Sequence, residues 1–364
     1  MKQVGSKPSL DKLRRAIDEV DRRILELLNE RARLALEVGR VKQASGAVYY
    51  APSREEDLLR KLQQVNPGPF PGSAIRAVWK EIISASLALE HPLVVAYLGP
   101  QATFTHQAGL KRFGLSARYQ PARTIGEVFD QVEKDKADYG VIPVENTTEG
   151  VVSHTLDMLL RSDLKIVAEV YLRVTHYLMN RSGRLEDVGR VYSHPHALAQ
   201  CRRWLEEHLP DVPVFDASST AQAARIASED PQVAAIAGEL ASGLYGLEVV
   251  EGRIEDNPNN FTRFLVIGRE IPEPSGRDKT SLVFAVKDEV GALYHMLRPF
   301  YESQVNLTKI ESRPMREEAW QYVFFVDCEG HVTDPAVEAA LGALEKRCRF
   351  LKILGSYPCS SPDD

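Results

Sequence analysis

Side chains that are apolar at every position but one recur at spacings of three and four residues from residue 10 to residue 41. The repeating positions are Leu10, Leu13, Ile17, Val20, Ile24, Leu27, Arg31, Leu34, Val38 and Val41. This period predicts one helix of roughly 35 residues, with Ser9 as its N-cap and with a seam suited to coiled-coil packing.

One position of this seam carries a guanidinium, that of Arg31, which needs an anionic partner. Arg14 and Lys42 border the seam. Because a helix rises about 1.5 Å per residue, Arg14 lies roughly 25 Å from Arg31, so one helix cannot bring both to one ligand. An antiparallel helix from a second protomer could do so. The alternative is a solvated helix in which Arg31 reaches out to water.

Two shorter helices are expected next. After a turn at Gly46, Ser53 is placed to cap a helix that reaches Val65. The breaker Asn66-Pro67-Gly68-Pro69 ends that helix, and a third one runs from about Ser73 to Glu90. The first 90 residues are therefore expected to be helical.

This module resembles the all-helical chorismate mutase family over nearly all of residues 9–91. The resemblance is carried by polar side chains at matching spacings: Arg14, Arg31, Lys42, Arg54, Glu55, Ser86 and Glu90. It implies an interlocked dimer in which Arg14 of the other copy, Arg31 and Arg54 hold the two carboxylates of chorismate. It also implies that Lys42 and Glu90 face the ether oxygen, and that Glu55 and Ser86 bind near the substrate hydroxyl. Two positions depart from the pattern: Ala51 stands where some relatives have Asp, and Glu90 where some have Gln.

The chemistry implied by this resemblance suits these residue types. A pericyclic rearrangement needs no nucleophile and no base. It needs the substrate folded in its reactive shape, and positive charge where the breaking C–O bond gathers negative charge. Arg and Lys side chains inside a helical bundle supply both.

At 364 residues the chain is too long for one core and suggests two or three domains. After residue 92 strands and helices alternate. Strands are expected at 93–98, 139–144, 166–174, 191–193, 234–237 and 264–268, and helices after Thr103 or Thr105 and at 197–208, 221–228 and 238–245. We expect 166–174 to cross into a second lobe and 253–264 to lead back, which places a cleft between two α/β lobes.

The returning stretch, Arg253 to Phe264, contains three Asn, an Asp and a Pro, which suit neither a helix interior nor a central strand. It is expected to be a loop whose side chains bond to backbone or to a ligand. Thr262 and Arg263 then lie at a loop-to-strand junction, where scaffolds often carry functional groups. The local alternative is a turn capped by Asn.

Residues 93–268 resemble the prephenate dehydratase family, with its two-lobed, periplasmic-binding-protein-like fold. The motifs that carry the resemblance are Glu145-Asn146, Ser193-His194-Pro195, Gln200-Cys201 and Thr262-Arg263-Phe264. The resemblance implies that Thr262 donates to the departing 4-hydroxyl, that Glu145, Asn146, Ser193 and Gln200 bind the substrate, and that Arg263 binds a carboxylate. Pro195 between His194 and His196 argues for a shaped turn rather than a general base, and Cys201 for a packing residue.

Beyond a linker at 272–276, the remaining chain predicts a βαββαβ order, which is ferredoxin-like. The expected elements are strands 280–286, 306–312, 322–328 and 350–356 and helices 291–300 and 335–346. With Gly291-Ala292-Leu293 and Glu311-Ser312-Arg313-Pro314, this part resembles an ACT domain of the phenylalanine-binding kind. The resemblance implies effector contacts from these seven residues and from Asn306 and Leu307, and helix N-terminal amides suit an amino-acid carboxylate. Val290 replaces a common Pro. The alternative is a dimerising domain that binds nothing.

Composition narrows the classes of ligand and of cellular location that the chain could have. Residues 1–92 hold 16 Lys and Arg against 12 Asp and Glu, whereas the rest of the chain is acidic. No basic run is interleaved with aromatic residues, so a small anion is favoured over nucleic acid. Cys201, Cys328, Cys348 and Cys359 lack metal-ligand spacing, which favours reduced thiols, no metal and a cytoplasmic location. No segment approaches 18 uninterrupted apolar residues, so no membrane span is expected.

Taken together, the chain resembles the bifunctional P-protein family, with a chorismate mutase module (1–92), a prephenate dehydratase domain (93–270) and an ACT domain (278–364). The resemblance implies conversion of chorismate through prephenate to phenylpyruvate, inhibition by L-phenylalanine, no cofactor, and a homodimer that could pair into tetramers. An arogenate dehydratase would use the same chemistry on the amine. An amino-acid sensor that binds ligand without turnover is the alternative from another class.

Overall fold

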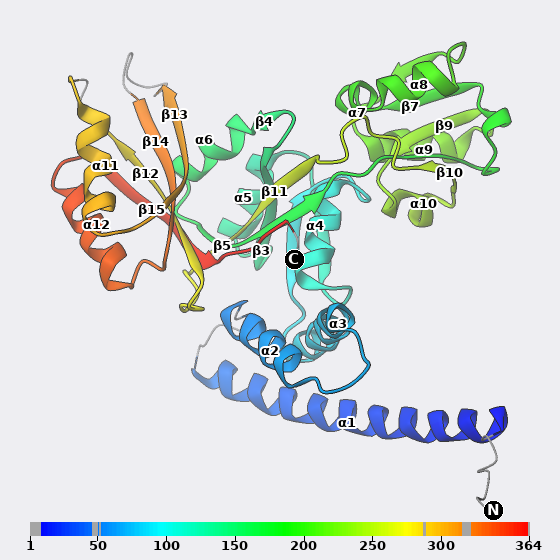
Figure 1. The fold of residues 1–364 in the computed structure, drawn as a ribbon, viewed down its shortest axis with the longest axis horizontal. Helices are drawn as coiled ribbons and strands as arrows, with labels where there is room; N and C mark the ends of the chain where they lie inside the picture. The colour runs from blue at the N-terminus through cyan, green and yellow to red at the C-terminus, as the bar shows by residue number, and fades with distance from the viewer. Residues whose placement is uncertain (1–8, 46–49, 51, 287–288, 315–321, 363–364) are drawn as a thin grey trace, which may run out of the picture.

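The computed structural model of the chain describes residues 9–45, 50, 52–286, 289–314 and 322–362. Three helices form a module at one end of the molecule (Figure 1): α1 (Leu10–Ser45), α2 (Pro52–Val65) and α3 (Gly72–Glu90). Helix α1 approaches α3 closely at Gly39, where an added Cβ would lie 3.1 Å from the Cβ of Glu90. The apolar seam of α1 between Leu10 and Leu27 is exposed.

The predicted long helix is confirmed, with 36 residues, and the Ser9 Oγ accepts from the backbone N–H of Lys12 at 3.4 Å. The cap predicted at Ser53 is wrong. Pro52 begins α2, and the Ser53 hydroxyl donates to the carbonyl of Glu273 in the linker before the last domain. The predicted turn at Gly46 and position Ala51 lie outside the described residues. Of the helices in the described ranges, none is long and apolar enough to cross a membrane.

The first α/β lobe is built on a sheet of order β2-β1-β3-β11-β5, with β4 added to β3. Its strands are β1 (Val94–Leu98), β2 (Arg118–Ala122), β3 (Tyr139–Asn146), β4 (Gly150–Val151), β5 (Lys165–Arg173) and β11 (Phe261–Gly268). Its helices are α4 (Phe104–Phe113), α5 (Ile125–Glu133) and α6 (Ser153–Arg161). Thr103 caps α4 by accepting from the N–H of His106 at 3.3 Å, which decides between the two predicted caps.

The second lobe has the sheet order β10-β6-β9-β7-β8. Its strands are β6 (Tyr177–Asn180), β7 (Arg190–Ser193), β8 (Val214–Asp216), β9 (Val233–Ala237) and β10 (Glu248–Gly252). Its helices are α7 (Pro195–Gln200), α8 (Arg202–His208), α9 (Thr220–Glu229) and α10 (Leu240–Tyr245), with a 3-10 turn at Leu185–Asp187. The helix predicted at 197–208 is broken at Cys201, which leaves helical geometry (φ −114°, ψ 15°) while its side chain is buried in the core. As predicted, the chain crosses between the lobes after β5 and returns before β11 (Figure 1).

The register of β3 against β11 determines which of their side chains share a face of the first sheet. Asn146 lies opposite Thr262, and Glu145 lies opposite Arg263. Because successive side chains of a strand point to opposite faces, Asn146 and Thr262 share one face while Glu145 and Arg263 share the other.

The last domain has the predicted βαββαβ order, with the sheet order β13-β14-β12-β15. Its elements are β12 (Asp278–Ala285), α11 (Ala292–Glu302), β13 (Leu307–Pro314), β14 (Tyr322–Glu329), α12 (Pro335–Glu345) and β15 (Phe350–Pro358). Both helices pack on one face of this sheet (Figure 1).

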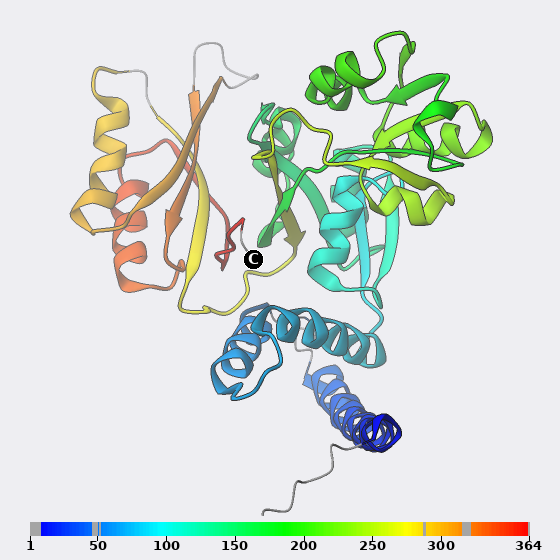
Figure 2. The same ribbon diagram turned by 45° about the vertical axis from the view of Figure 1, so that its right-hand side comes forward.

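Strand β15 fixes this domain against β5 of the first lobe. Gly355 meets the backbone of Ile166 so closely that a Cβ there would lie 2.1 Å from the Ile166 carbonyl oxygen. Lys352 donates to the carbonyls of Leu159, Leu160 and Ser162 at the end of α6. The two domains therefore share a tightly packed contact. Figure 2 shows the helical module below both.

Candidate active sites

Side chains from α1, α2 and α3 line a cavity of about 230 Å³. Six of the residues predicted for the helical module contribute to it: Arg31, Lys42, Arg54, Glu55, Ser86 and Glu90. Arg31 donates to the Ser86 hydroxyl, and the Lys42 ammonium lies 3.4 Å from the Glu90 carboxylate. Three cations and two carboxylates thus surround a space suited to a small anionic molecule.

Burial strengthens the electrostatic interactions of the charged groups in this cavity. Desolvation lowers the pKa of Arg31, and the Glu90 carboxylate opposes that effect. The Lys42 and Glu90 side chains are 21% and 8% exposed. Electrostatic attraction acts more strongly where water is scarce, so these groups can stabilise charge that develops on a bound molecule.

Arg14 lies outside this cavity. Its side chain is 67% exposed and its nearest carboxylate, that of Asp11, is 4.0 Å away. Arg14 and Arg31 lie on the same helix, about 17 residues or roughly 25 Å apart at the usual helical rise. Within one chain the structure therefore does not bring Arg14 to the other predicted residues.

A residue of the first lobe that the sequence analysis missed reaches the wall of this cavity. Arg112, in the last turn of α4, places Nη2 3.8 Å from the Glu55 carboxylate and lies over the Tyr50 ring, 5.3 Å from its centroid. Both Glu55 and Tyr50 line the cavity. No sequence motif marks Arg112, because its significance depends on how the module docks against α4.

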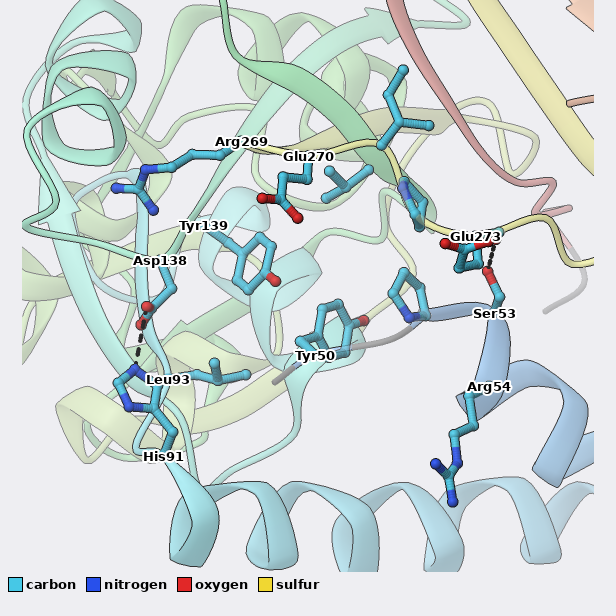
Figure 3. Close-up of a pocket in the computed structure, with 14 residues that line it drawn as sticks. Tyr50, Ser53, Arg54, His91, Leu93, Asp138, Tyr139, Arg269, Glu270 and Glu273 are labelled. Carbon is cyan, nitrogen blue, oxygen red and sulfur yellow. Dashed lines mark hydrogen bonds and ion pairs between the residues drawn. The ribbon is translucent and has the colours of Figure 1, made fainter. Parts of the chain in front are cut away.

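A second cavity, of about 510 Å³, adjoins the helical module where it meets the first lobe (Figure 3). Arg54 and Tyr50 border both this cavity and the smaller one. The other lining groups include the pair of His91 and Asp138, 3.3 Å apart. Of the predicted site residues, this cavity holds Arg54 alone among those described.

Where the two lobes meet, five polar side chains form a continuous set of hydrogen bonds, which we call the interlobe cluster. Its members are Asn146, His176, Gln200, Asn260 and Thr262. Three of them, Asn146, Gln200 and Thr262, were predicted from motifs far apart in the sequence. The bonded atoms are 2.8 to 2.9 Å apart.

The hydrogen bonds of the cluster have a definite direction. The Asn146 amide oxygen accepts from the backbone N–H groups of Thr148 and Glu149, at 2.8 and 3.0 Å, so its NH2 group is the donor. That group donates to Asn260 and to the Thr262 Oγ1, both at 2.8 Å. Because Thr262 accepts from Asn146, its own hydroxyl proton is left to donate elsewhere.

Two cluster members were missed by the sequence analysis. Asn260 and His176 are 1% and 2% exposed. Asn260 donates to the Gln200 oxygen at 2.9 Å, and His176 Nε2 contacts the same oxygen at 2.9 Å. Since an amide oxygen only accepts, His176 must carry its proton on Nε2, and burial lowers the pKa of this histidine. The Asn-rich loop was the available signal for Asn260, whereas nothing in the sequence singles out His176.

The remaining residues predicted in the second lobe do not join the cluster. The Ser193 hydroxyl is buried and donates to the carbonyl of Ile236 within the lobe at 2.6 Å, and its predicted substrate contact stays a prediction. His194 caps α7 by accepting from the N–H of His196, in line with a shaped turn. Burial raises the pKa of the Cys201 thiol, which suits a packing residue.

Glu145 and Arg263 point away from the interlobe cluster. The Arg263 guanidinium is buried and binds Glu169 at 2.8 Å, Asp327 at 2.7 Å and the Tyr357 hydroxyl at 3.0 Å. Glu145 binds Lys309 of β13 at 2.5 Å. Both side chains thus face the last domain, on the side of the sheet away from Thr262. In this structure both side chains make contacts between domains, and the substrate contacts predicted for them stay predictions.

Burial lowers the pKa of Arg263, but Asp327, Tyr357 and Glu169 outweigh burial and raise it. Glu169 also binds the ammonium of Lys279 at 2.8 Å. Asp327 accepts from the Ser281 hydroxyl at 2.6 Å. The buried charges are therefore paired and hydrogen-bonded, the condition under which ion pairs persist inside proteins.

The predicted effector residues lie at two places in the last domain. Gly291 adopts the left-handed conformation (φ +80°) before α11, and Ala292 and Leu293 open that helix. Glu311, Ser312, Arg313 and Pro314 end the edge strand β13, which Leu307 begins after Asn306. Arg313 pairs with Asp157 of α6 at 3.0 Å, so in this structure it contacts the first lobe. Within the described residues, no group of His, Cys, Asp and Glu is placed to hold a metal ion.

Comparison with known proteins covers all three domains. Residues 13–91 match the family model "Chorismate mutase type II", residues 95–272 "Prephenate dehydratase", and residues 280–346 "ACT domain". A bifunctional chorismate mutase/prephenate dehydratase of Aquifex aeolicus is 52% identical over 96% of this chain and 98% of its own. One from Stutzerimonas stutzeri is 46% identical over 96% and 97%. The structure of prephenate dehydratase from Arthrobacter aurescens in complex with L-Phe has a TM-score of 0.68 and 38% identity, over 74% of this chain and 91% of its own.

The helical module with its cationic cavity, the two lobes and the ACT domain define a multifunctional enzyme that joins an isomerase to a carbon–oxygen lyase. The chain belongs to the family of bifunctional chorismate mutase/prephenate dehydratases. It therefore carries two activities of aromatic amino acid biosynthesis, chorismate mutase and prephenate dehydratase, on one polypeptide.

Proposed function

We propose that the cavity between α1, α2 and α3 binds chorismate and that the interlobe cluster binds prephenate. Chorismate becomes prephenate in the first, and prephenate becomes phenylpyruvate at the second. We further propose that the domains divide at residues 1–92, 93–270 and 278–364, and that the enzyme works in the cytoplasm without a cofactor.

In the mutase cavity, Arg31 and Arg54 hold the two carboxylates of chorismate in the folded shape that the rearrangement needs. Lys42 and Glu90 lie 3.4 Å apart and face the ether oxygen, where the Lys42 charge stabilises the negative charge of the breaking bond. Glu55 and Ser86 bind near the hydroxyl. The fixed position of these groups supports the assignment, since this reaction is catalysed by orienting the substrate and by stabilising the charge that develops on it.

A homodimer completes the mutase site. The exposed apolar seam of α1 supports this, because contiguous apolar surface of that kind marks interaction sites. Arg14 lies on the same helix as the seam. An antiparallel pair of α1 helices would carry Arg14 of one copy toward Arg31 of the other, and such dimers could pair into tetramers.

At the dehydratase site, the single observation that carries the assignment is the bond from Asn146 to Thr262 Oγ1 at 2.8 Å. It leaves the Thr262 hydroxyl proton available for the departing 4-hydroxyl of prephenate. The electrons of the C–COO⁻ bond form the new ring double bond and carbon dioxide leaves. The 4-hydroxyl leaves as water with a proton relayed through Thr262, which regains its own proton from solvent. Aromatisation drives the step, and Asn146, Gln200 and Thr262 orient the substrate.

L-phenylalanine is the proposed effector of the ACT domain. The relative from Arthrobacter aurescens binds L-Phe, which supports this. Helix α11 begins at Gly291, and backbone N–H groups at a helix start suit the carboxylate of an amino acid. Its inhibition requires tighter binding to a less active arrangement than to the active one.

The direction of the Asn146–Thr262 bond provides the test. Asn146→Asp keeps the shape of the side chain but supplies a carboxylate that only accepts, so Thr262 would donate to it instead of to prephenate. Phenylpyruvate formation should fall at least about hundredfold, the usual worth of a positioned proton donor. Mutase turnover of the same sample should stay within about twofold of wild type. Dehydratase activity near the wild-type value in Asn146→Asp would contradict the proposed role of the bond.

A further inference from the structure

A third cavity, of about 560 Å³, lies between the mutase module and the dehydratase domain. Its walls come from α2 and α3 on one side and from α4 and β5 on the other, and Ser360 near the C-terminus closes part of it. Of the residues assigned to catalysis above, Glu55 is the member that borders it.

Positive charge dominates the walls of this cavity. Four cations line it, Arg76, Lys80, Lys111 and Arg112, against the carboxylates of Glu55 and Glu169. Glu169 is already bound by Arg263 and by Lys279, both at 2.8 Å. Its charge is therefore neutralised from the side of the ACT domain and is not available to the cavity.

The four cations differ in how they are paired. Glu56 binds Arg76 at 2.8 and 2.9 Å, and Lys111 donates to the Tyr171 carbonyl at 2.9 Å. Arg112 forms an ion pair with Glu55 without a hydrogen bond, and Lys80 is the least paired. Within the part of the chain that the structure describes, the Lys80 ammonium has neither a hydrogen bond nor an ion pair. The Arg112 Nε is buried without an acceptor, and its Nη2 stays 3.8 Å from the Glu55 carboxylate. Unsatisfied buried donors and unpaired buried charges are costly, and proteins usually supply partners for them.

The titration of Lys80 agrees with a shortage of negative charge here. Burial, and then the charges of Arg112 and Lys111, outweigh the opposing charges of Glu55 and Glu81 and lower the pKa of Lys80 to about 8. A bound anion would offset both causes, because it would bond to the ammonium and screen it from its cationic neighbours.

We propose that this cavity, which we call the interdomain anion site, binds a small dianion held by Lys80 and Arg112. Two cations in the lining match two negative charges, and the volume admits either an inorganic oxyanion or an organic dicarboxylate. Leu59 and Val170 add an apolar wall. Since Glu55 borders both this site and the mutase cavity, a ligand on Arg112 would compete with Glu55, a consequence that rests on the proposed chorismate site.

Calorimetric titration of the full-length enzyme with sodium sulfate, and separately with sodium malonate, tests the proposal at pH 8. Both probes are dianions at that pH and carry no titrating proton of their own. Sodium chloride keeps the ionic strength constant. Binding heats are used rather than melting temperatures, because sulfate stabilises proteins without binding to a site.

Three variants locate the binding. Lys80→Met should raise the dissociation constant at least tenfold, whereas Lys136→Met, which removes the same charge from an exposed loop, should leave it unchanged. Arg31→Met should also leave it unchanged, since that residue belongs to the mutase cavity. In two buffers of different ionisation enthalpy, wild type should take up a fraction of a proton on binding, and Lys80→Met should take up none.

Binding of either probe with this dependence on Lys80 supports the site, and the probe that binds identifies the inorganic or the organic class. The proposal is overturned if wild type binds neither probe, or if Lys80→Met binds as tightly as wild type. Loss of binding in Arg31→Met would instead assign the anion to the mutase cavity. Because no turnover is measured, these outcomes are independent of the proposed catalytic roles.

Discussion

Arg263 on β11 and Asp327 on β14 form a buried ion pair, with Nη1 and Oδ2 2.7 Å apart, across the contact between the dehydratase and ACT domains. Thr262, the neighbour of Arg263, points to the other face of the sheet and joins the interlobe cluster. Glu145 and Asn146 on β3 repeat this arrangement, with Lys309 bound on one face and Thr262 on the other. Two adjacent strand ends thus connect the proposed prephenate site directly to the regulatory domain.

Asp327→Leu should destabilise the enzyme by about 3–5 kcal/mol, the usual cost of removing one partner of a buried ion pair. The double variant Arg263→Met/Asp327→Leu should lose less, because Glu169 keeps Lys279 as its partner. Urea unfolding of the single and double variants measures the difference. If the double variant were less stable than Asp327→Leu alone, the pair would not be the source of the loss.

The ion pair of Arg263 and Asp327 should also lose its stabilising effect at acid pH. Burial raises the pKa of Asp327, but Arg263 and Ser281 together bring it below its usual value. A carboxylate with a lowered pKa in the folded state contributes its full stability above the unfolded pKa, near 3.9, and loses it as the pH falls further. The stability difference between wild type and the double variant should therefore be constant from about pH 7 to 5 and shrink below about pH 4. A difference that already disappears at pH 6 would contradict this.

Arg112→Gln should lower mutase kcat/KM about five- to tenfold, a coupling of about 1 kcal/mol, although Arg112 belongs to the dehydratase domain. The reason is that Arg112 positions Glu55, 3.8 Å away, at the wall of the mutase cavity. The assay is run in chloride buffer, so that the interdomain anion site is not filled. Lys111→Gln removes the same charge one residue away, where the ammonium binds the Tyr171 carbonyl at 2.9 Å, and should have little effect.

A double-mutant cycle separates positioning from a general structural defect. In a Glu55→Gln background, Arg112→Gln should cause no further loss of mutase activity, because the interaction is already gone. An equal further loss in that background would mean that Arg112 supports the module in some other way.

His176→Leu should lower dehydratase kcat/KM at least about tenfold, because it removes a donor that fixes the Gln200 amide. His176→Gln should restore much of the activity, since its NH2 group can donate to the same oxygen. Phenylpyruvate formation is measured for both variants, with mutase activity as the internal control. Equal activity of the Leu and Gln variants would show that the hydrogen bond to Gln200 does not matter.

Arg14→Ala and Arg31→Ala should each abolish mutase activity, and coexpression of the two chains should restore about a quarter of it. In a two-fold symmetric dimer whose site combines Arg14 of one copy with Arg31 of the other, half of the random dimers are mixed and each has one intact site. Absence of recovery in purified mixed dimers would place Arg14 outside the mutase site.

More of the fold than of the sites could be predicted from the sequence. The period from Leu10 to Val41 predicts α1 almost to the residue, because a long amphipathic helix is specified locally. The break at Cys201 was not predictable, since it depends on how that side chain packs into the second lobe. Arg112 likewise depends on domain docking.

At the sites, the motifs correctly brought Asn146, Gln200 and Thr262 together across the two lobes. They did not indicate that Arg263 and Glu145 face the ACT domain, since a motif does not state which face of a strand each residue takes. Strand alternation was the unused signal: if Thr262 faces one side of the sheet, its neighbour Arg263 faces the other. Knowing what covers the other face required the structure.

The most direct test of the account is the dehydratase turnover of Thr262→Val, measured beside Thr262→Ser in the same full-length enzyme supplied with chorismate. Valine has the shape of threonine without the hydroxyl, whereas serine keeps it. The account predicts that Thr262→Val consumes chorismate at the wild-type rate and accumulates prephenate, with phenylpyruvate formation reduced at least about hundredfold, while Thr262→Ser retains a large part of that activity. Phenylpyruvate formation by Thr262→Val within about tenfold of wild type would show that Thr262 is not the proton donor.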